Sequence, residues 1–230
     1  MKTVDLRTHK RILNTFTGEA EKKLLIWIAE RLPGWVMPDL LTIVGVFGAV
    51  VVFCGYALTN LHPGFLWLAN LGFVINWFGD SLDGTLARVR KIERPVYGFY
   101  VDHATDAFVE ILLFLGVGVS PFVRFELASL ALIGYLLLSV LVYLRTFLRG
   151  EFTISYGKLG PTEGRLIAMS ANTLVFFIGN PQVRLFRLTL SVYDWIVVGI
   201  VLLLLVITVS TTLRQARLLS ELDPPGGKPE

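Results

Sequence analysis

Six long apolar runs constrain this chain more than any other feature of its sequence. A helix needs about 20 mostly apolar residues to cross a hydrocarbon core about 30 Å thick. The runs extend over Leu40 to Leu58, Gly64 to Phe78, Val101 to Val119, Leu127 to Leu148, Leu166 to Ile178 and Trp195 to Leu213. The second, third and fifth are short because polar residues interrupt their ends, so we expect these helices to continue past the charges. A mean hydropathy of +0.65, with 17% charged residues, excludes an ordinary soluble domain. The sequence predicts an all-α integral membrane protein with six transmembrane helices.

The basic residues predict the orientation of these spans. With six spans, 18 of the 21 lysines and arginines fall on one side, and only Arg124, Arg184 and Arg187 fall on the other. Positively charged loops remain in the cytoplasm, so both termini and the loop after the second span are expected there. The isoelectric point near 9.1 then reflects contact with the inner leaflet and its membrane lipids. Nucleic acid is not an expected partner.

The segment "EAEKKLLIWIAERL" before the first span has a different pattern. Leu24, Leu25, Ile28 and Leu32 recur at helical spacing, with charged residues around the rest of the wheel. This is typical of an amphipathic helix lying on the membrane surface. The first 35 residues mix acidic with basic side chains and show no small-residue cleavage site, so no signal peptide is expected. We expect one domain over residues 1–220 and a flexible tail, ending in "DPPGGKPE", over 221–230.

Two acidic stripes occur where the second and third spans approach the cytoplasm. Asp80 and Asp83 share one face of a helix, and Asp102 and Asp106 share one face of the next. Helices joined by a short loop are antiparallel neighbours, so the two stripes are expected to face each other. Four carboxylates in one place repel, and burying them costs several kcal/mol unless a cation lies among them. The stripes therefore predict a divalent metal site.

The neighbouring residue types suggest what this site binds. Oxygen ligands suit a hard ion such as Mg²⁺, Mn²⁺ or Ca²⁺, and four carboxylates are enough for two ions that clamp a phosphoryl group. Small residues at Gly84, Ala87 and Gly98 would let a phosphate or nucleotide approach the backbone, and Arg88 can bind a phosphate with two hydrogen bonds. Alternatively, the glycines pack helices together and Arg88 neutralises the aspartates.

The pattern Asp80-x-x-Asp83-Gly84-x-x-Ala87-Arg88, followed by Gly98-x-x-x-Asp102-x-x-x-Asp106, resembles the signature of the CDP-alcohol phosphotransferase family. The resemblance implies a six-span homodimer in which an alcohol hydroxyl attacks the β-phosphorus of a CDP-linked donor and CMP leaves. It implies Mg²⁺ or Mn²⁺, two ions, on Asp80, Asp83, Asp102 and Asp106, and nucleotide contacts from Asp80, Asp83, Gly84, Ala87, Arg88 and Gly98.

Two positions depart from the family pattern. Nine residues separate Arg88 from Gly98, where the family usually has eight. This difference lies in the loop expected to cover the nucleotide. In "MPDLLT" at the start of the first span, Asp39 replaces the usual asparagine of the family's Pro-Asn-x-x-Thr. No role is assigned to Asp39.

The segment "DHATD" resembles the choline and ethanolamine phosphotransferase branch, in which a soluble CDP-amino alcohol donates to diacylglycerol. In much of the family the last aspartate, here Asp106, acts as the base. In this branch the resemblance implies that His103 and Glu163 act together as the base, because "PTEGR" is similar to the branch's Thr-Glu pair. A neutral histidine polarised by a carboxylate can deprotonate a lipid hydroxyl near pH 7.

Two other functions are compatible with the residues. In a second branch of the family, CDP-diacylglycerol donates to a small polar alcohol such as glycerol phosphate, inositol phosphate or serine. A phosphorylated acceptor would need a basic pocket, for which Arg145, Lys158 and Arg165 are the candidates. A divalent-cation transporter is a different class of protein. The acidic residues argue against it because they gather at one membrane edge, whereas transporter sites lie near the midplane.

Overall fold

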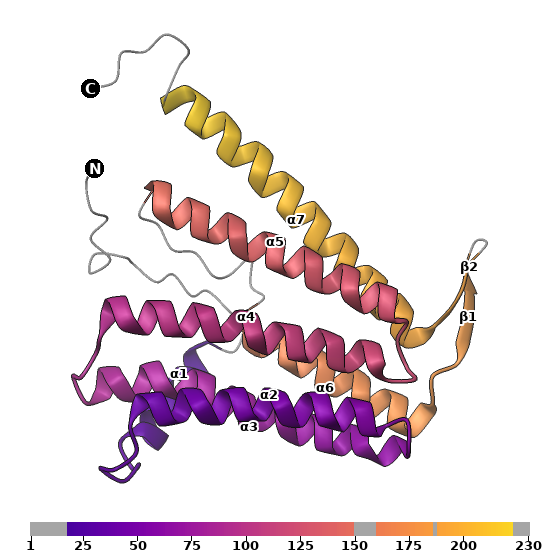
Figure 1. The fold of residues 1–230 in the computed structure, drawn as a ribbon, viewed down its shortest axis with the longest axis horizontal. Coiled ribbons are helices and arrows are strands. Elements are labelled where there is room, and N and C mark those ends of the chain that lie inside the picture. The colour runs from indigo at the N-terminus through magenta and orange to yellow at the C-terminus, as the bar shows by residue number, and fades with distance from the viewer. Residues whose placement is uncertain (1–17, 150–159, 186–187, 223–230) are drawn as a thin grey trace.

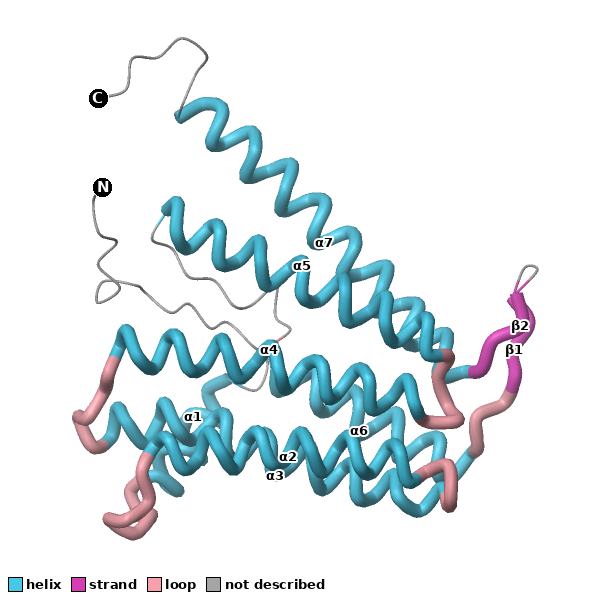
Figure 2. Tube along the Cα trace, in the orientation of Figure 1, coloured by secondary structure: helices cyan, strands magenta, loops and turns pink. Residues whose placement is uncertain are grey.

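The computed structural model describes residues 18–149, 160–185 and 188–222, and this part of the chain is mostly helical (Figures 1 and 2). The helices are α1 (Gly18–Ala29), α2 (Pro38–Leu58), α3 (Leu66–Val89), α4 (Pro95–Val119), α5 (Phe125–Arg149), α6 (Pro161–Ile178) and α7 (Val192–Leu222), with a short 3₁₀ turn, η2 (Pro63–Phe65), before α3. The six predicted apolar runs coincide with α2 to α7. The all-α expectation is confirmed apart from one hairpin.

The hairpin was not predicted. Strands β1 (Gln182–Leu185) and β2 (Leu188–Ser191) pair in antiparallel fashion between α6 and α7. Val183 lies opposite Leu190, and Leu185 lies opposite Leu188. The apolar residues alternate along both strands, but Val183, Leu185 and Leu188 are exposed, whereas Leu190 is buried. Each strand has four residues, and an alternation this short is a weak signal between two long apolar runs.

Proline residues begin three of the helices. Pro38, Pro95 and Pro161 lie in the first turns of α2, α4 and α6, where a missing backbone N–H breaks no helical hydrogen bond. The helices are longer than the apolar runs, as expected, and α3 continues past Phe78 to Val89. The signature aspartates therefore lie on regular helix. Helix α7 ends at Leu222, two residues inside the predicted tail, and residues 223–230 lie outside the described part of the chain.

Glycines bring α2 and α3 into backbone contact. A Cβ atom on Gly79 would collide with the backbone of Gly45, and one on Gly48 would collide with the backbone of Asn76. The side chain of Asn76 crosses this seam, where its Nδ2 donates to the Gly45 carbonyl oxygen at 2.9 Å. Close approach of this kind is how helices associate where no hydrophobic effect drives them together. The seam fixes the depth and rotation of α3 relative to α2.

The remaining helices surround this pair. Helix α2 also packs on α4, α6 packs on α3, and α5 contacts both α4 and α7. In Figure 1, α5 and α7 lean away from the group formed by α2, α3, α4 and α6. Within the described residues, three helices are long and apolar enough to cross a membrane, at Pro38–Leu58, Phe125–Leu148 and Val192–Glu221. The spans predicted at α3, α4 and α6, which carry the polar site residues, remain predictions.

Helix α1 coincides with the predicted amphipathic segment. Its Leu25 and Ala29 are buried in a cluster with Leu82 and Leu86 of α3, whereas Trp27 is exposed. The loop that follows is held by Arg90, whose guanidinium donates to four carbonyl oxygens, those of Leu32, Pro33, Gly34 and Val36. Helix α1 is thus docked on the bundle by one face. Its position at a membrane surface stays a prediction.

Candidate active site

Three of the four signature aspartates meet in the structure. One carboxylate oxygen from each of Asp80, Asp102 and Asp106 can be chosen so that all three lie within 4.8 Å of one another. All three side chains are partly buried. The predicted meeting of the two acidic stripes is therefore observed for these residues. Hard oxygen ligands at this spacing, with the only cysteine of the chain located elsewhere at Cys54, fit a divalent cation such as Mg²⁺ or Mn²⁺.

The helices reach this arrangement differently from the sequence prediction. We expected α3 and α4 to be direct neighbours because a short loop joins them. Instead α2 packs extensively on α3 and also on α4, and direct packing of α3 on α4 is not among the main contacts of the described residues. The carboxylates thus project toward one another from two helices that α2 holds in place. Helices carrying facing negative charge gain little from packing tightly together.

Asp83 is oriented by α2. Its Oδ2 accepts a hydrogen bond from the Thr42 hydroxyl at 2.6 Å, and its Oδ1 accepts one from the backbone N–H of Gly84. It does not belong to the three-carboxylate group found among the described residues. This role of Thr42, the last residue of the "MPDLLT" motif, was not predicted. The similarity of this motif to the family's Pro-Asn-x-x-Thr was the one indication in the sequence that Thr42 has a role. In the structure this threonine positions the signature residue Asp83.

Arg165 enters the acidic group from α6. Its Nη2 donates to Asp80 Oδ2 at 2.6 Å, and its Nε donates to Asn76 Oδ1 at 2.8 Å. The arginine side chain is only 11% exposed. Its Nη1 is one of the few buried side-chain nitrogen and oxygen atoms in the described residues without a hydrogen-bond partner. The protein therefore supplies one positive charge of its own to the acidic group, which the sequence analysis did not foresee.

The small signature residues leave open space. A Cβ atom on Gly98 would meet nothing within 4 Å, and one on Gly84 would meet only the end of the Arg88 side chain, at 3.3 Å. Arg88 is exposed and its Nη2 donates to Thr85 Oγ1 at 3.1 Å. Neither glycine is required by helix packing here, in contrast to Gly79 in the α2–α3 seam. This favours the interpretation that the glycines leave room for a ligand.

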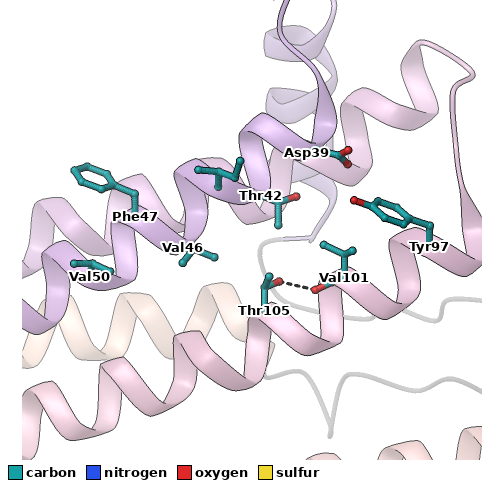
Figure 3. Close-up of a pocket in the computed structure, with 9 residues that line it drawn as sticks. Asp39, Thr42, Val46, Phe47, Val50, Tyr97, Val101 and Thr105 are labelled. Carbon is teal, nitrogen blue, oxygen red and sulfur yellow. Dashed lines mark hydrogen bonds between the residues drawn. The ribbon is translucent and has the colours of Figure 1, made fainter.

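An apolar groove of about 430 Å³ lies between α2 and α4 (Figure 3). Nine residues line it: Asp39, Thr42, Ile43, Val46, Phe47, Val50, Tyr97, Val101 and Thr105. Thr42 is the residue that hydrogen-bonds Asp83, and Thr105 precedes Asp106 in the chain. In Figure 3, Asp39 and Tyr97 lie at one end of the groove and Phe47 and Val50 lie toward the other, and Thr42 connects the wall of the groove to Asp83. The apolar end of the groove follows α2, one of the three helices that meet the membrane-span criteria.

Comparison with known proteins identifies the family. The family model for CDP-alcohol phosphatidyltransferases matches residues 35–213, which contain all of these groups. The chain belongs to the CDP-alcohol phosphatidyltransferase family. Members of this family are transferases that generally use a divalent metal ion, and the acidic group of α3 and α4 is where this chain could hold one.

Individual relatives in the family differ in the substrates that their names state. The chain is 31% identical over 173 residues to a CDP-diacylglycerol–serine O-phosphatidyltransferase of Encephalitozoon cuniculi. The aligned region covers 70% of this chain and 42% of that relative. It is 36% identical over 83 residues to a phosphatidylinositol phosphate synthase of Cutibacterium acnes, with 36% of this chain and 37% of that relative aligned. It is 24% identical over 165 residues to cholinephosphotransferase 1 of Danio rerio, with 66% of this chain and 41% of that relative aligned. The chain thus spans less than half the length of each of these relatives.

His103 lies in the family signature between two metal-ligand candidates. Its Nδ1 is 2.7 Å from the Phe99 carbonyl oxygen and 3.8 Å from Asp102 Oδ2. A carbonyl oxygen can only accept, so Nδ1 carries the proton and Nε2 is the basic nitrogen of the neutral ring. The ring stacks on Phe99 with 4.1 Å between centroids and meets Tyr143 edge-on at 5.3 Å. Packing and this hydrogen bond fix both the tautomer and the ring orientation.

The other candidates for base and acceptor pocket lie on α5 and α6. Glu163 is buried, and its Oε2 accepts a hydrogen bond from the backbone N–H of Gly160 at 2.9 Å, which caps the start of α6. This capping contact was not predicted from the sequence. Arg145 is partly buried on α5, and Lys158 lies outside the described residues. Arg165, the third basic residue considered for an acceptor pocket, contacts the acidic group through Asp80.

Proposed function

We propose that this protein transfers a substituted phosphate group from a CDP-linked donor to an alcohol hydroxyl, with release of CMP. The observation that carries the proposal is the convergence of Asp80, Asp102 and Asp106 in a chain whose family signature contains all three. In the reaction, the acceptor oxygen bonds to the β-phosphorus and the bond from that phosphorus to the bridging oxygen breaks. The hydroxyl proton passes to a base, and CMP departs with the bridging oxygen.

In this proposal the aspartates hold Mg²⁺ or Mn²⁺, two ions, with Asp83 as the fourth ligand. When bound, such ions would offset the charge of the donor's pyrophosphate and of the departing CMP. Arg88 binds a phosphate, and the space at Gly84 and Gly98, together with the small side chain of Ala87, admits the nucleotide. Arg165 holds Asp80 in place by the 2.6 Å ion pair. Asp106, or His103 acting with Glu163, accepts the proton from the hydroxyl.

The apolar groove supports a lipid as one of the two substrates. A diacylglycerol or CDP-diacylglycerol must keep its acyl chains in hydrocarbon while its reactive group meets the acidic site. The wall of the groove includes Thr42, which hydrogen-bonds the signature residue Asp83, and continues along Val46, Phe47 and Val50 of α2 (Figure 3). We propose that an acyl chain of the lipid substrate lies there. Both branches of the family need such a site.

The main proposal is transfer from a CDP-amino alcohol to diacylglycerol or a similar lipid alcohol. It is supported by the "DHATD" sequence and by the hydrogen bond that sets the tautomer of His103. It is also supported by the ion pair between Arg165 and Asp80, because a phosphorylated acceptor would need Arg165 for its own phosphate. The alternative is transfer from CDP-diacylglycerol to a small polar alcohol. The name of the Encephalitozoon cuniculi relative favours that alternative, with serine as acceptor.

A donor screen tests both. Purified protein in lipid nanodiscs receives CDP-choline, CDP-ethanolamine or CDP-diacylglycerol with Mg²⁺ or Mn²⁺, and CMP release is measured. Each donor is combined with diacylglycerol or with serine, glycerol phosphate or inositol phosphate. CMP release only from the CDP-amino alcohols with diacylglycerol supports the main proposal. Release only from CDP-diacylglycerol supports the alternative, and no release from any pair would contradict the proposed reaction.

The proposed topology has six spans, both termini and the acidic site in the cytoplasm, and a homodimer as the family expectation. The 18-to-3 distribution of basic residues predicts which loops react with an impermeant thiol reagent. On a Cys54→Ala background, a cysteine at Leu61 should be labelled from outside the cell. A cysteine at Lys91 should be labelled only after the membrane is opened. Both sites are exposed. The reverse pattern would place the acidic site on the face without cytosolic CDP donors.

Thr42→Val tests the contribution of the hydroxyl that orients Asp83. The substitution keeps the shape of the side chain and removes the 2.6 Å hydrogen bond. Residues that orient metal ligands typically contribute about 10- to 100-fold in metal affinity or activity, so we expect a loss of CMP release in that range. Thr212→Val is the matched control, because the Thr212 hydroxyl bonds only to its own helix, at the Thr208 carbonyl, on an exposed face of α7. Equal activity of the two variants would contradict a positioning role for Thr42.

A further inference from the structure

Glu21 of α1 joins two helices that carry the acidic site. Its Oε1 accepts hydrogen bonds from Trp77 Nε1 at 2.6 Å, Thr162 Oγ1 at 2.8 Å and, more weakly, Ser81 Oγ at 3.4 Å. Trp77 and Ser81 lie on α3, and Thr162 lies on α6. Helix α1 itself packs against α3 (Figure 1). One carboxylate oxygen thus bridges three helices.

The bonds to Glu21 lie beside the bonds that hold Asp80. On α3, Trp77 and Ser81 are one helical turn apart and flank Asp80 in the chain. On α6, Thr162 and Arg165 are also one turn apart. Arg165 donates to Asp80 at 2.6 Å and to Asn76 at 2.8 Å. Near Asp80, helices α3 and α6 are therefore linked by polar contacts through Arg165 and through Glu21. Farther from the acidic group, Asn70 of α3 bonds Asn172 and Thr173 of α6.

We propose that Glu21 is a positioning residue that, by linking α3 to α6, fixes Asp80 within the acidic group. A carboxylate that accepts from Trp77 and Thr162 forms charge-assisted hydrogen bonds, which are shorter and stronger than neutral ones. Without the acceptor, both donors would be left unsatisfied between the helices. Because the glycine seam holds α3 on α2, α6 would then shift relative to α3, and Arg165 would move the Asp80 side chain with it.

The polar link is separable from the docking of α1. Leu25 and Ala29 are 6% and 2% exposed and bury the inner face of α1 against Leu82 and Leu86. This apolar contact keeps α1 on the bundle when Glu21 is changed. Conversely, shortening the side chain of Leu25 to that of alanine weakens the docking of α1 and leaves the Glu21 side chain intact. The two effects can therefore be measured independently.

The test is a titration of the purified full chain with Mn²⁺ alone, following free Mn²⁺ by electron paramagnetic resonance. Glu21→Leu should raise the Mn²⁺ dissociation constant about tenfold or more. Glu21→Gln, which keeps an oxygen acceptor, should restore most of the affinity. Glu19→Leu is the matched control, since Glu19 is exposed on the same helix. Leu25→Ala should lower the melting temperature with little effect on Mn²⁺ binding.

Three results would overturn the inference: wild-type affinity in Glu21→Leu, an equal loss in Leu25→Ala, or no Mn²⁺ binding by the wild-type protein. The inference rests on the proposed function, because it takes the acidic group to bind a divalent cation. A failure of the inference and a failure of the proposed function can nevertheless be told apart. If the wild-type protein binds Mn²⁺ but releases CMP from no donor, the proposed reaction fails, while the comparison of Mn²⁺ affinities still decides the role of Glu21.

Discussion

Replacing Asp102 or Asp106 by asparagine is expected to reduce CMP release by about 10²- to 10³-fold. Each change keeps the size of the side chain and removes one negative charge from a group whose ligand atoms lie within 4.8 Å. A bound metal ion stabilises transition-state charge by several kcal/mol, and each 1.4 kcal/mol or so corresponds to a factor of ten in rate. Losing one ligand forfeits a large part of this stabilisation. Asp80→Asn should have a similar effect, because it also breaks the ion pair with Arg165.

The measurement is CMP release together with Mn²⁺ binding by each variant. Asp83→Asn belongs in the same series. Its carboxylate lies outside the three-carboxylate group, and comparison with the others shows whether it acts as a fourth ligand. Glu126→Gln, at the exposed start of α5, controls for the loss of one negative charge. Near wild-type turnover in two of the aspartate variants would exclude a metal site built from α3 and α4.

Replacing His103 by alanine is expected to lower kcat by about 10²- to 10⁴-fold, the usual contribution of a general base. A base acts in the transition state, so the affinity for donor and for Mn²⁺ should change little. His103→Asn is the matched variant. Its amide can still donate to the Phe99 carbonyl oxygen, as Nδ1 does, but it provides no basic nitrogen. It should therefore be as slow as the alanine variant.

Glu163→Gln tests the partner of His103. Glutamine can also accept from the Gly160 N–H at the start of α6, so the helix cap survives and only the negative charge is lost. The double variant of His103 and Glu163 should be scarcely slower than either single one, as expected for residues that act as a unit. If both single variants keep their rate and Arg165→Ala raises the KM for a phosphorylated acceptor, the CDP-diacylglycerol branch is correct.

The sequence predicted those features that depend on local periodicity. The apolar runs located α2 to α7, and spacings of three and four residues indicated that aspartates of α3 and α4 converge, as Asp80, Asp102 and Asp106 do. It could not predict Thr42 as the partner of Asp83, because that contact arises only when α2 packs on both α3 and α4. The engagement of Arg165 with Asp80 likewise joins residues 85 positions apart, brought together by the packing of α6 on α3. Long-range contacts of this kind leave no periodic signal.

The glycine seam between α2 and α3 has a mechanical consequence. With backbone touching backbone at Gly45 and Gly79, neither helix can tilt or slide unless its neighbour follows. In the proposed membrane topology, lateral pressure from the surrounding lipid would therefore displace the two helices together. Thr42 lies on one of these helices and Asp83 on the other, so their separation is expected to stay constant. We expect this part of the proposed site to be insensitive to bilayer thickness.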